Sequence, residues 1–156
     1  KDLSAQTFLD SIGAEYFEAS AVVKYNKPFD MKRDSFEIKL TIDDANENLV
    51  MPVQFTGVKL LYTGITSRSE QLIAEKETDS KINRVGESIT ISVPLNMGYK
   101  PEEVEEAGSV RYTLDYSYKK KVVIGRSQDG SPIYQEEFAR DKYNSPSKQV
   151  FLVRSE

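Results

Sequence analysis

Apolar and polar residues alternate one by one in several separate stretches of this sequence, and this alternation constrains the fold more than any other feature. The clearest stretches are 36–42, 89–93 and 110–118. Successive side chains of a β-strand point to opposite faces of a sheet, so a period of two gives the strand one apolar face and one polar face. We therefore expect half-buried antiparallel strands at these positions.

Further strands are expected where aromatic and β-branched residues gather between turn-forming residues. These stretches are 15–25, 50–62 and 149–153. Residues 122–125 and 133–134 flank Asp129-Gly130, a pair that favours a hairpin turn. Segment 70–75 is compatible with a strand or a helical turn, and we favour the strand.

Two short helices are also expected. Ser4 is a suitable N-cap and Gly13 a suitable stop for one helix in the first segment. Pro101 and Gly108 bracket a second segment, in which acidic residues follow the proline and would stabilise the positive end of a helix.

Seven or eight strands with one or two short helices predict an all-β fold, an antiparallel β-sandwich of the immunoglobulin or fibronectin type III kind. The length of 156 residues fits one domain with its own core. We expect residues 1–14 to form a short helix or a linker, and residues 15–156 to form a single β-sandwich domain.

Composition excludes several classes of function. The chain has neither cysteine nor histidine, so it lacks thiol nucleophiles, imidazole bases and the usual zinc ligands. Its net charge of −4 argues against a nucleic-acid partner, and phosphate-binding glycine motifs are missing. We predict no enzymatic activity, no catalytic residue and no cofactor. No apolar run approaches the length of about 20 residues that crosses a bilayer, so we expect no transmembrane segment.

One acidic stretch offers oxygen ligands of the kind that calcium prefers. Its candidate ligands are Asp43, Asp44, Asn46 and Glu47. The stretch lacks the spacing and the central glycine of an EF-hand loop, and a solvated β-turn is the favoured alternative.

Three tyrosines of the strand at 110–118, namely Tyr112, Tyr116 and Tyr118, are candidates for stacking a sugar or anchoring an interface. Packing in the core of the sandwich is the favoured alternative, since the three residues lie on one face of an alternating strand.

The basic run that follows the tyrosines consists of Lys119, Lys120 and Lys121. It is a candidate contact for an anionic head group or an acidic partner. The favoured alternative is a set of edge-strand lysines that prevent sheet-to-sheet aggregation.

Four segments together resemble the type-2 late embryogenesis abundant domain, also called the water stress and hypersensitive response domain. They are FEIKLTIDDANEN, VQFTGVKLLYTG, RVGESITISVPL and VRYTLDYSY, between residues 36 and 119. The resemblance implies a fibronectin-type-III-like sandwich without enzymatic activity, associated with stress protection and, in bacteria, sometimes found on envelope proteins. The family provides no catalytic residues to carry over.

Two functions follow as expectations. The first is a non-enzymatic, stress-associated sandwich tethered to a membrane through a removed N-terminal segment, as a chain beginning at Lys1 suggests. The second is an extracytoplasmic binding or adhesion module that recognises a protein or a glycan. A cell-envelope or extracytoplasmic location is favoured over a cytoplasmic one, and the oligomeric state stays open.

Overall fold

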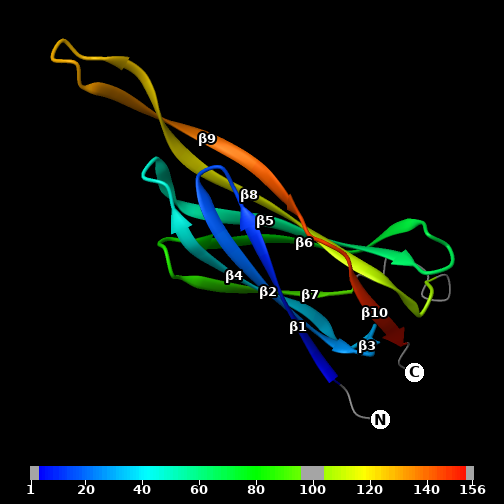
Figure 1. Ribbon diagram of the computed structural model, residues 1–156. Helices are drawn as coiled ribbons and strands as arrows, with labels where there is room; N and C mark the ends of the chain where they lie inside the picture. Colours follow the sequence, from blue (N-terminus) through cyan, green and yellow to red (C-terminus); the bar gives the residue numbers. More distant parts are fainter. Residues whose placement is uncertain (1–3, 96–103, 154–156) are drawn as a thin grey trace.

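The computed structural model describes residues 4–95 and 104–153, and this part of the chain contains ten strands and no helix (Figure 1). The strands are β1 (Ser4–Gly13), β2 (Phe17–Lys27), β3 (Phe29–Asp30), β4 (Ser35–Ala45), β5 (Leu49–Gly64), β6 (Glu70–Ile82), β7 (Ser88–Pro94), β8 (Ala107–Arg126), β9 (Pro132–Asn144) and β10 (Lys148–Val153). Over the described ranges no helix is long and apolar enough to cross a membrane.

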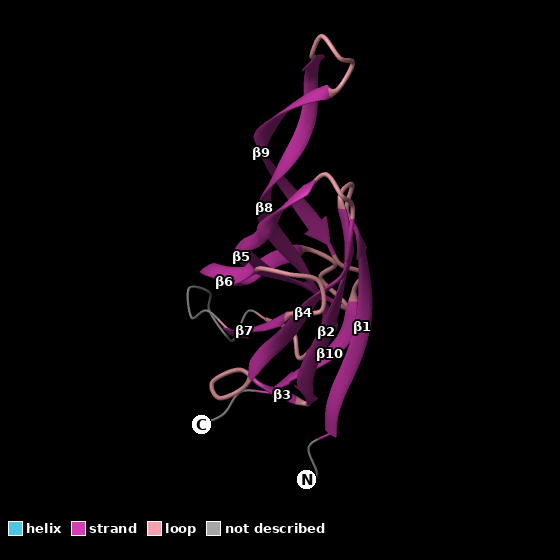
Figure 2. Ribbon diagram, turned by 90° about the vertical axis from the view of Figure 1, so that its left-hand side faces the viewer, coloured by secondary structure: helices cyan, strands magenta, loops and turns pink. Residues whose placement is uncertain are grey.

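The strands form two sheets, and the expectation of an all-β, largely antiparallel protein is confirmed. One sheet has the order β1-β2-β4-β7, and the other has the order β3-β10-β8-β5-β6 with β9 beside β8. All neighbouring strands run antiparallel except β3 and β10. Figures 1 and 2 show β8 and β9 extending together beyond the rest of the molecule.

The hydrophobic core lies between the facing sides of the two sheets. Ile38 and Leu40 of β4 and Leu114 of β8 are fully buried, in keeping with the period of two in their strands. The two sheets meet directly where the ring of Phe17 on β2 packs edge-on against Tyr116 on β8, with centroids 5.4 Å apart. Burial of each such side chain stabilises the fold by about 1.5–3 kcal/mol relative to exposure.

A polar cluster also joins the sheets inside this core. The hydroxyl of Tyr112 on β8 donates a hydrogen bond of 2.6 Å to the carboxylate of Asp10 on β1. The ammonium of Lys148 on β10 lies 3.6 Å from the other oxygen of Asp10. Burial raises the pKa of Tyr112, and the bond to Asp10 raises it further, so the phenol stays protonated as the donor.

The prediction of a short N-terminal helix over residues 4–13 is wrong, because this segment is strand β1. It pairs with β2 along its whole length. Its inward positions include Ile12 and the buried Asp10, while Leu9 points outward with 68% of its surface exposed. A charged residue in the inward row conceals the period of two, and pairing with β2 outweighs the local helix signals.

The second expected helix, over residues 101–108, lies partly outside the described residues. Its described end is not helical, because residues 104–106 are irregular and Ala107 begins strand β8. Segment 70–75 is confirmed as a strand and continues to Ile82 as β6. Strands β1 and β3 bring the described total to ten instead of the expected seven or eight.

Candidate binding site

The most distinctive surface is a hairpin of β8 and β9 that leaves the body of the protein. Strand β8 pairs with β5 only as far as Lys120, which lies opposite Leu49. The amide of Lys121 then donates a last hydrogen bond to the carbonyl of Asn48, at 2.8 Å. Beyond this point β8 pairs only with β9, and the two strands form the projecting ribbon in Figure 2.

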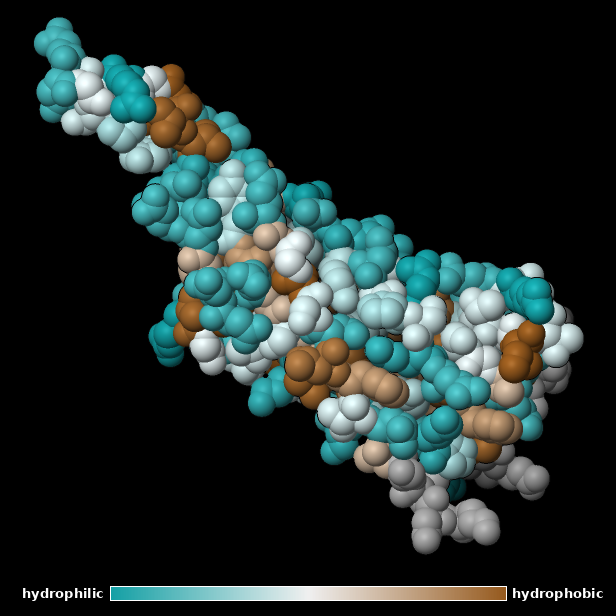
Figure 3. All heavy atoms as spheres, viewed as in Figure 1, coloured by the Kyte–Doolittle hydropathy of each residue, from teal (hydrophilic) through white to brown (hydrophobic). Residues whose placement is uncertain are grey.

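Large apolar side chains are exposed at the far end of this ribbon, and we call them the distal patch. Its members, with their exposed fractions, are Val123 (53%), Ile124 (58%), Ile133 (44%) and Tyr134 (52%). Val123 lies opposite Tyr134, and a bulge at Ile124 interrupts the ladder. Figure 3 shows hydrophobic side chains gathered on the projecting arm. Clustered exposed apolar residues are typical of interaction surfaces.

The turn that closes the hairpin is held by its own hydrogen bonds, and the predicted Asp129-Gly130 hairpin is confirmed. Gly130 has a φ of +89°, a conformation that favours glycine. The amide of Ser127 donates to the carbonyl of Ser131 at 2.9 Å. Hydrogen bonds from Ser127 and Ser131 lower the pKa of Asp129 to about 2. The turn therefore presents the distal patch on an ordered support.

The three candidate tyrosines of β8 are buried in the core. Tyr112, Tyr116 and Tyr118 each have 6% or less of their surface exposed. Tyr116 and Tyr118 both pack edge-on against Phe17 of the other sheet. Burial raises the pKa of Tyr116 to about 12, with a smaller contribution from Asp141. Core packing accounts for the position of these rings.

Two of the three candidate lysines, Lys119 and Lys120, lie where β8 is flanked on both sides, so the interpretation as edge-strand lysines is wrong for them; Lys121 lies at the start of the two-stranded ribbon. Lys119 and Lys120 stand between β5 and β9. On β9, Glu137 lies opposite Lys120 and Glu136 lies opposite Lys121. The ammonium of Lys120 also lies 5.4 Å above the ring of Tyr16. Lys120 and Lys121 thus each lie opposite a glutamate of the neighbouring strand, whereas Lys119 lies opposite Phe138.

The candidate calcium residues lie at the end of β4 and in the turn that follows it. Asp43 accepts a hydrogen bond from Ser20 at 3.4 Å, and Asp44 accepts one from the Ala45 amide at 2.9 Å. Asn46 accepts one from the Asn48 amide at 2.8 Å. The bonds to Asp44 and Asn46 are typical of a turn that satisfies its own backbone, whereas the bond to Asp43 joins two neighbouring strands.

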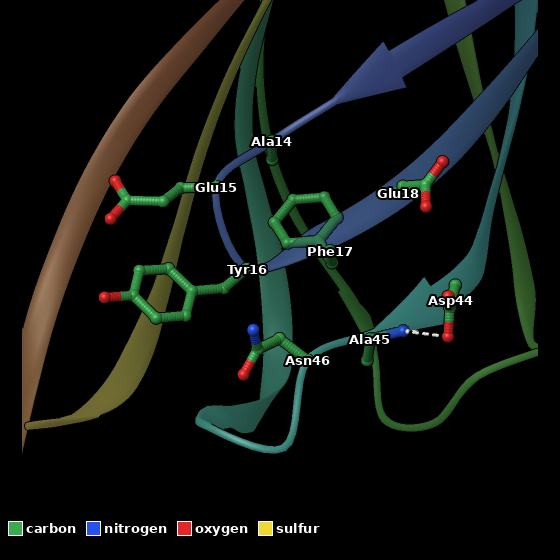
Figure 4. Close-up of a pocket in the computed structure, with 8 residues that line it drawn as sticks. All are labelled: Ala14, Glu15, Tyr16, Phe17, Glu18, Asp44, Ala45 and Asn46. Carbon is green, nitrogen blue, oxygen red and sulfur yellow. Dashed lines mark hydrogen bonds between the residues drawn. The ribbon is translucent and has the colours of Figure 1, made fainter.

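The acidic turn borders a shallow hollow of about 250 Å³. Its lining residues are Ala14, Glu15, Tyr16, Phe17, Glu18, Asp44, Ala45 and Asn46. Figure 4 shows the side chains of Glu15 and Glu18 on opposite sides of the hollow, pointing away from each other. Glu47 is exposed in the turn outside this lining. Within the ranges 4–95 and 104–153, no three His, Cys, Asp or Glu side chains are grouped to hold a metal ion.

One structural role was missed in the sequence. Glu105, one of the acidic residues in the second expected helix, instead holds the turn between β5 and β6 through hydrogen bonds. Its carboxylate accepts hydrogen bonds from the amides of Thr66, at 2.9 Å, and Ser67, at 2.8 Å. These bonds, with those from Ser67 contributing most, lower the pKa of Glu105 to about 2. The contact spans 38 residues of sequence, and no local pattern signals it.

The described residues form a two-sheet, largely antiparallel β protein from which the β8–β9 hairpin projects. In comparisons with known proteins, no family model matches this chain, and no curated protein matches its sequence.

Proposed function

We propose that this protein is a non-enzymatic binding module that presents the β8–β9 hairpin to a protein partner. The distal patch is the observation that carries the proposal. Val123, Ile124 and Tyr134 each leave about half or more of their surface exposed, on a ribbon that contributes nothing to the core at that end. Aromatic and aliphatic side chains on an ordered support are suited to enter a pocket on another protein.

The charges around the distal patch favour a protein surface over an anionic polymer or a lipid head group. Residues 119–126 of β8 carry three lysines and one arginine, whereas residues 129–137 carry one aspartate and two glutamates. Because the two strands lie side by side, the ribbon has no surface of a single sign. Polyanion binding depends on such a surface, whereas mixed charges around an apolar centre are typical of protein interfaces.

Substitution of Val123 and Ile124 by serine tests this proposal, because both residues lie on β8, beyond its last pairing with β5. A protein recovered with the wild-type chain from its own cells is purified and titrated against both forms. We expect saturable one-to-one binding to the wild type and an affinity at least about tenfold lower for the double variant. Leu9→Ser on β1, an apolar position with 68% of its surface exposed, should bind like the wild type.

Equal affinity of the wild type and the double variant would contradict the proposal, as would the absence of any saturable partner. Circular dichroism of each variant establishes that the fold is retained.

The finer fold type and the stress-associated role are part of the same proposal. An immunoglobulin-like or fibronectin-type-III-like sandwich is supported by the two facing sheets. The type-2 late embryogenesis abundant resemblance stays a prediction from the four sequence segments that carry it, which lie in or next to strands β4, β5, β7 and β8. In this view the module works at the cell envelope, tethered to a membrane. The sequence encoded ahead of Lys1 tests the tether, since the proposal requires a leader or lipid-anchor sequence there.

A further inference from the structure

Strand β9 has one unpaired edge over its whole length. It is 13 residues long and pairs with β8 alone among the described strands. Only Ala139 and Tyr143 of β9 are even partly buried. A long free edge presents a row of unpaired backbone N–H and C=O groups, which is a template for another strand.

The outward face of β9 carries a regular set of side chains next to this edge. It consists of Tyr134, Glu136, Phe138, Arg140 and Lys142, at alternate positions of the strand. Phe138 has 59% of its surface exposed, and the guanidinium of Arg140 lies 5.2 Å from its ring. Phe138 is the middle residue of β9, with one acidic and one basic residue placed symmetrically about it.

The symmetry of a strand pair restricts how two copies can join at this edge. Two identical antiparallel strands in one continuous sheet are related by a two-fold axis perpendicular to that sheet, so one residue must lie opposite its own copy. With Phe138 on the axis, all 13 residues are paired, from Pro132 opposite Asn144 onward. Glu136 then lies opposite Arg140 of the second copy, and this pair occurs twice.

Neighbouring registers place like charges opposite each other. If the axis passes through Glu136, Glu137 or Arg140, that charged residue lies opposite the same residue of the second copy. An axis at Ala139 sets Glu137 against Asp141 twice. Among registers within two residues of the centre, the one at Phe138 alone combines opposite-charge pairs with no like-charge pair. Cross-strand pairs of opposite charge contribute about 0.2–1 kcal/mol each, and like charges opposite each other destabilise the pair.

We propose that this protein forms a two-fold dimer in which the β9 edges of two copies pair antiparallel with Phe138 on the axis. The pairing continues the larger sheet across both copies. The two rings of Phe138 meet at the centre, and Tyr134 lies opposite Lys142 of the other copy. Because the strands run in opposite directions, the two distal patches lie at opposite ends of the paired strands, and Val123 and Ile124 of each patch, on β8, lie away from the pairing edge.

Charge reversal at the predicted pairs tests the proposal. Glu136→Arg and Arg140→Glu each set like charges opposite each other twice, whereas the double variant restores opposite charges. In sedimentation velocity over a concentration series, we expect the wild type to reach twice the chain mass of 17.7 kDa. Each single variant should remain at the chain mass, and the double variant should recover the dimer.

The matched control is Glu77→Arg on β6, an exposed glutamate at the opposite edge of the same sheet. It should leave the dimer intact. A wild type that stays at the chain mass at every concentration would overturn the proposal. So would single variants that dimerise like the wild type, or a double variant that stays at the chain mass although circular dichroism shows that it is folded.

A second measurement fixes the register, since the chain has no cysteine. Phe138→Cys places two thiols opposite each other across the axis, where the separation of paired residues is within reach of a disulfide. We expect a cross-linked dimer under mild oxidation, and none with the exposed Leu72→Cys on β6. Equal cross-linking of the two variants would contradict this register.

The dimer and the proposed partner binding are separately testable. The Val123 and Ile124 double variant leaves the β9 edge unchanged and should dimerise like the wild type. Glu136→Arg leaves those two side chains in place, so a partner should still bind to the monomer. Failure of one set of results therefore does not imply failure of the other.

Discussion

Removal of the Tyr112 hydroxyl tests how the two sheets are held together. Tyr112→Phe deletes the donor of the 2.6 Å bond to Asp10 and keeps the ring, so the packing of β8 is preserved. Asp10 is 95% buried and retains only the ammonium of Lys148, at 3.6 Å, as a described charged partner. The variant therefore leaves a buried carboxylate short of one hydrogen bond.

The expected cost follows from the charge of the acceptor. A hydrogen bond to a charged group contributes about 1.5–3 kcal/mol to stability, and water cannot readily replace the donor in this core. We expect the free energy of unfolding to fall by about 2 kcal/mol. For a domain of this size that corresponds to a decrease in Tm of about 4–8 °C.

Urea unfolding at neutral pH, followed by far-ultraviolet circular dichroism, measures this change. Tyr134→Phe is the matched control, because the Tyr134 side chain is exposed in the distal patch, and it should unfold like the wild type. If Tyr112→Phe lies within about 0.5 kcal/mol of the wild type, the range of an ordinary surface substitution, the polar cluster does not join the sheets as described.

Three further predictions concern pH and backbone packing. Burial raises the pKa of Tyr62 and of Tyr116 to about 12, so the native state holds these protons more tightly than the unfolded chain does. Stability should be constant just below pH 10 and fall between pH 10 and about 12, as measured by urea unfolding across this range. The pKa of Glu105 is lowered to about 2 from 4.5, so its contribution is complete above pH 4.5 and is lost as pH falls toward 2. Glu105→Gln should reduce the dependence of Tm on pH in that range, and an unchanged dependence would contradict the role of its bonds to the turn. A Cβ on Gly108 would lie 2.5 Å from the Thr63 carbonyl oxygen and the Tyr62 ring, whereas one on Gly125 would meet nothing within 4 Å. Gly108→Ala should therefore lower stability by about 1–3 kcal/mol and Gly125→Ala should not, which thermal unfolding of the two variants measures.

The sequence predicts those strands whose inward row is purely apolar. Phe36, Ile38 and Leu40 of β4 are of this kind, and the strand is found where it is expected. Strand β1 is missed because Asp10 interrupts its inward row of apolar residues. The fold accommodates this buried carboxylate through a hydrogen bond from Tyr112, which is 102 residues away in the chain.

The hairpin is predicted only in part. Its turn at Asp129-Gly130 is evident, but the run of lysines 119–121 breaks the alternation and conceals that 107–126 is one strand. The distal patch is exposed because β5 pairs with β8 only as far as Lys120. The free edge of β9 depends on which strands are neighbours. Both are properties of pairing between distant segments, which no local pattern contains.

The most direct measurement of the central claim is partner binding by a protein whose hairpin has been shortened. Lys121 and Glu136 lie opposite each other, so an Asn-Gly pair can join them in place of residues 122–135 as a two-residue hairpin turn. The removed residues lie outside the core. We predict that the shortened protein stays folded, as circular dichroism measures, and has no measurable affinity for the partner. A shortened protein that binds the partner like the wild type would contradict the claim that the projecting hairpin is the binding surface.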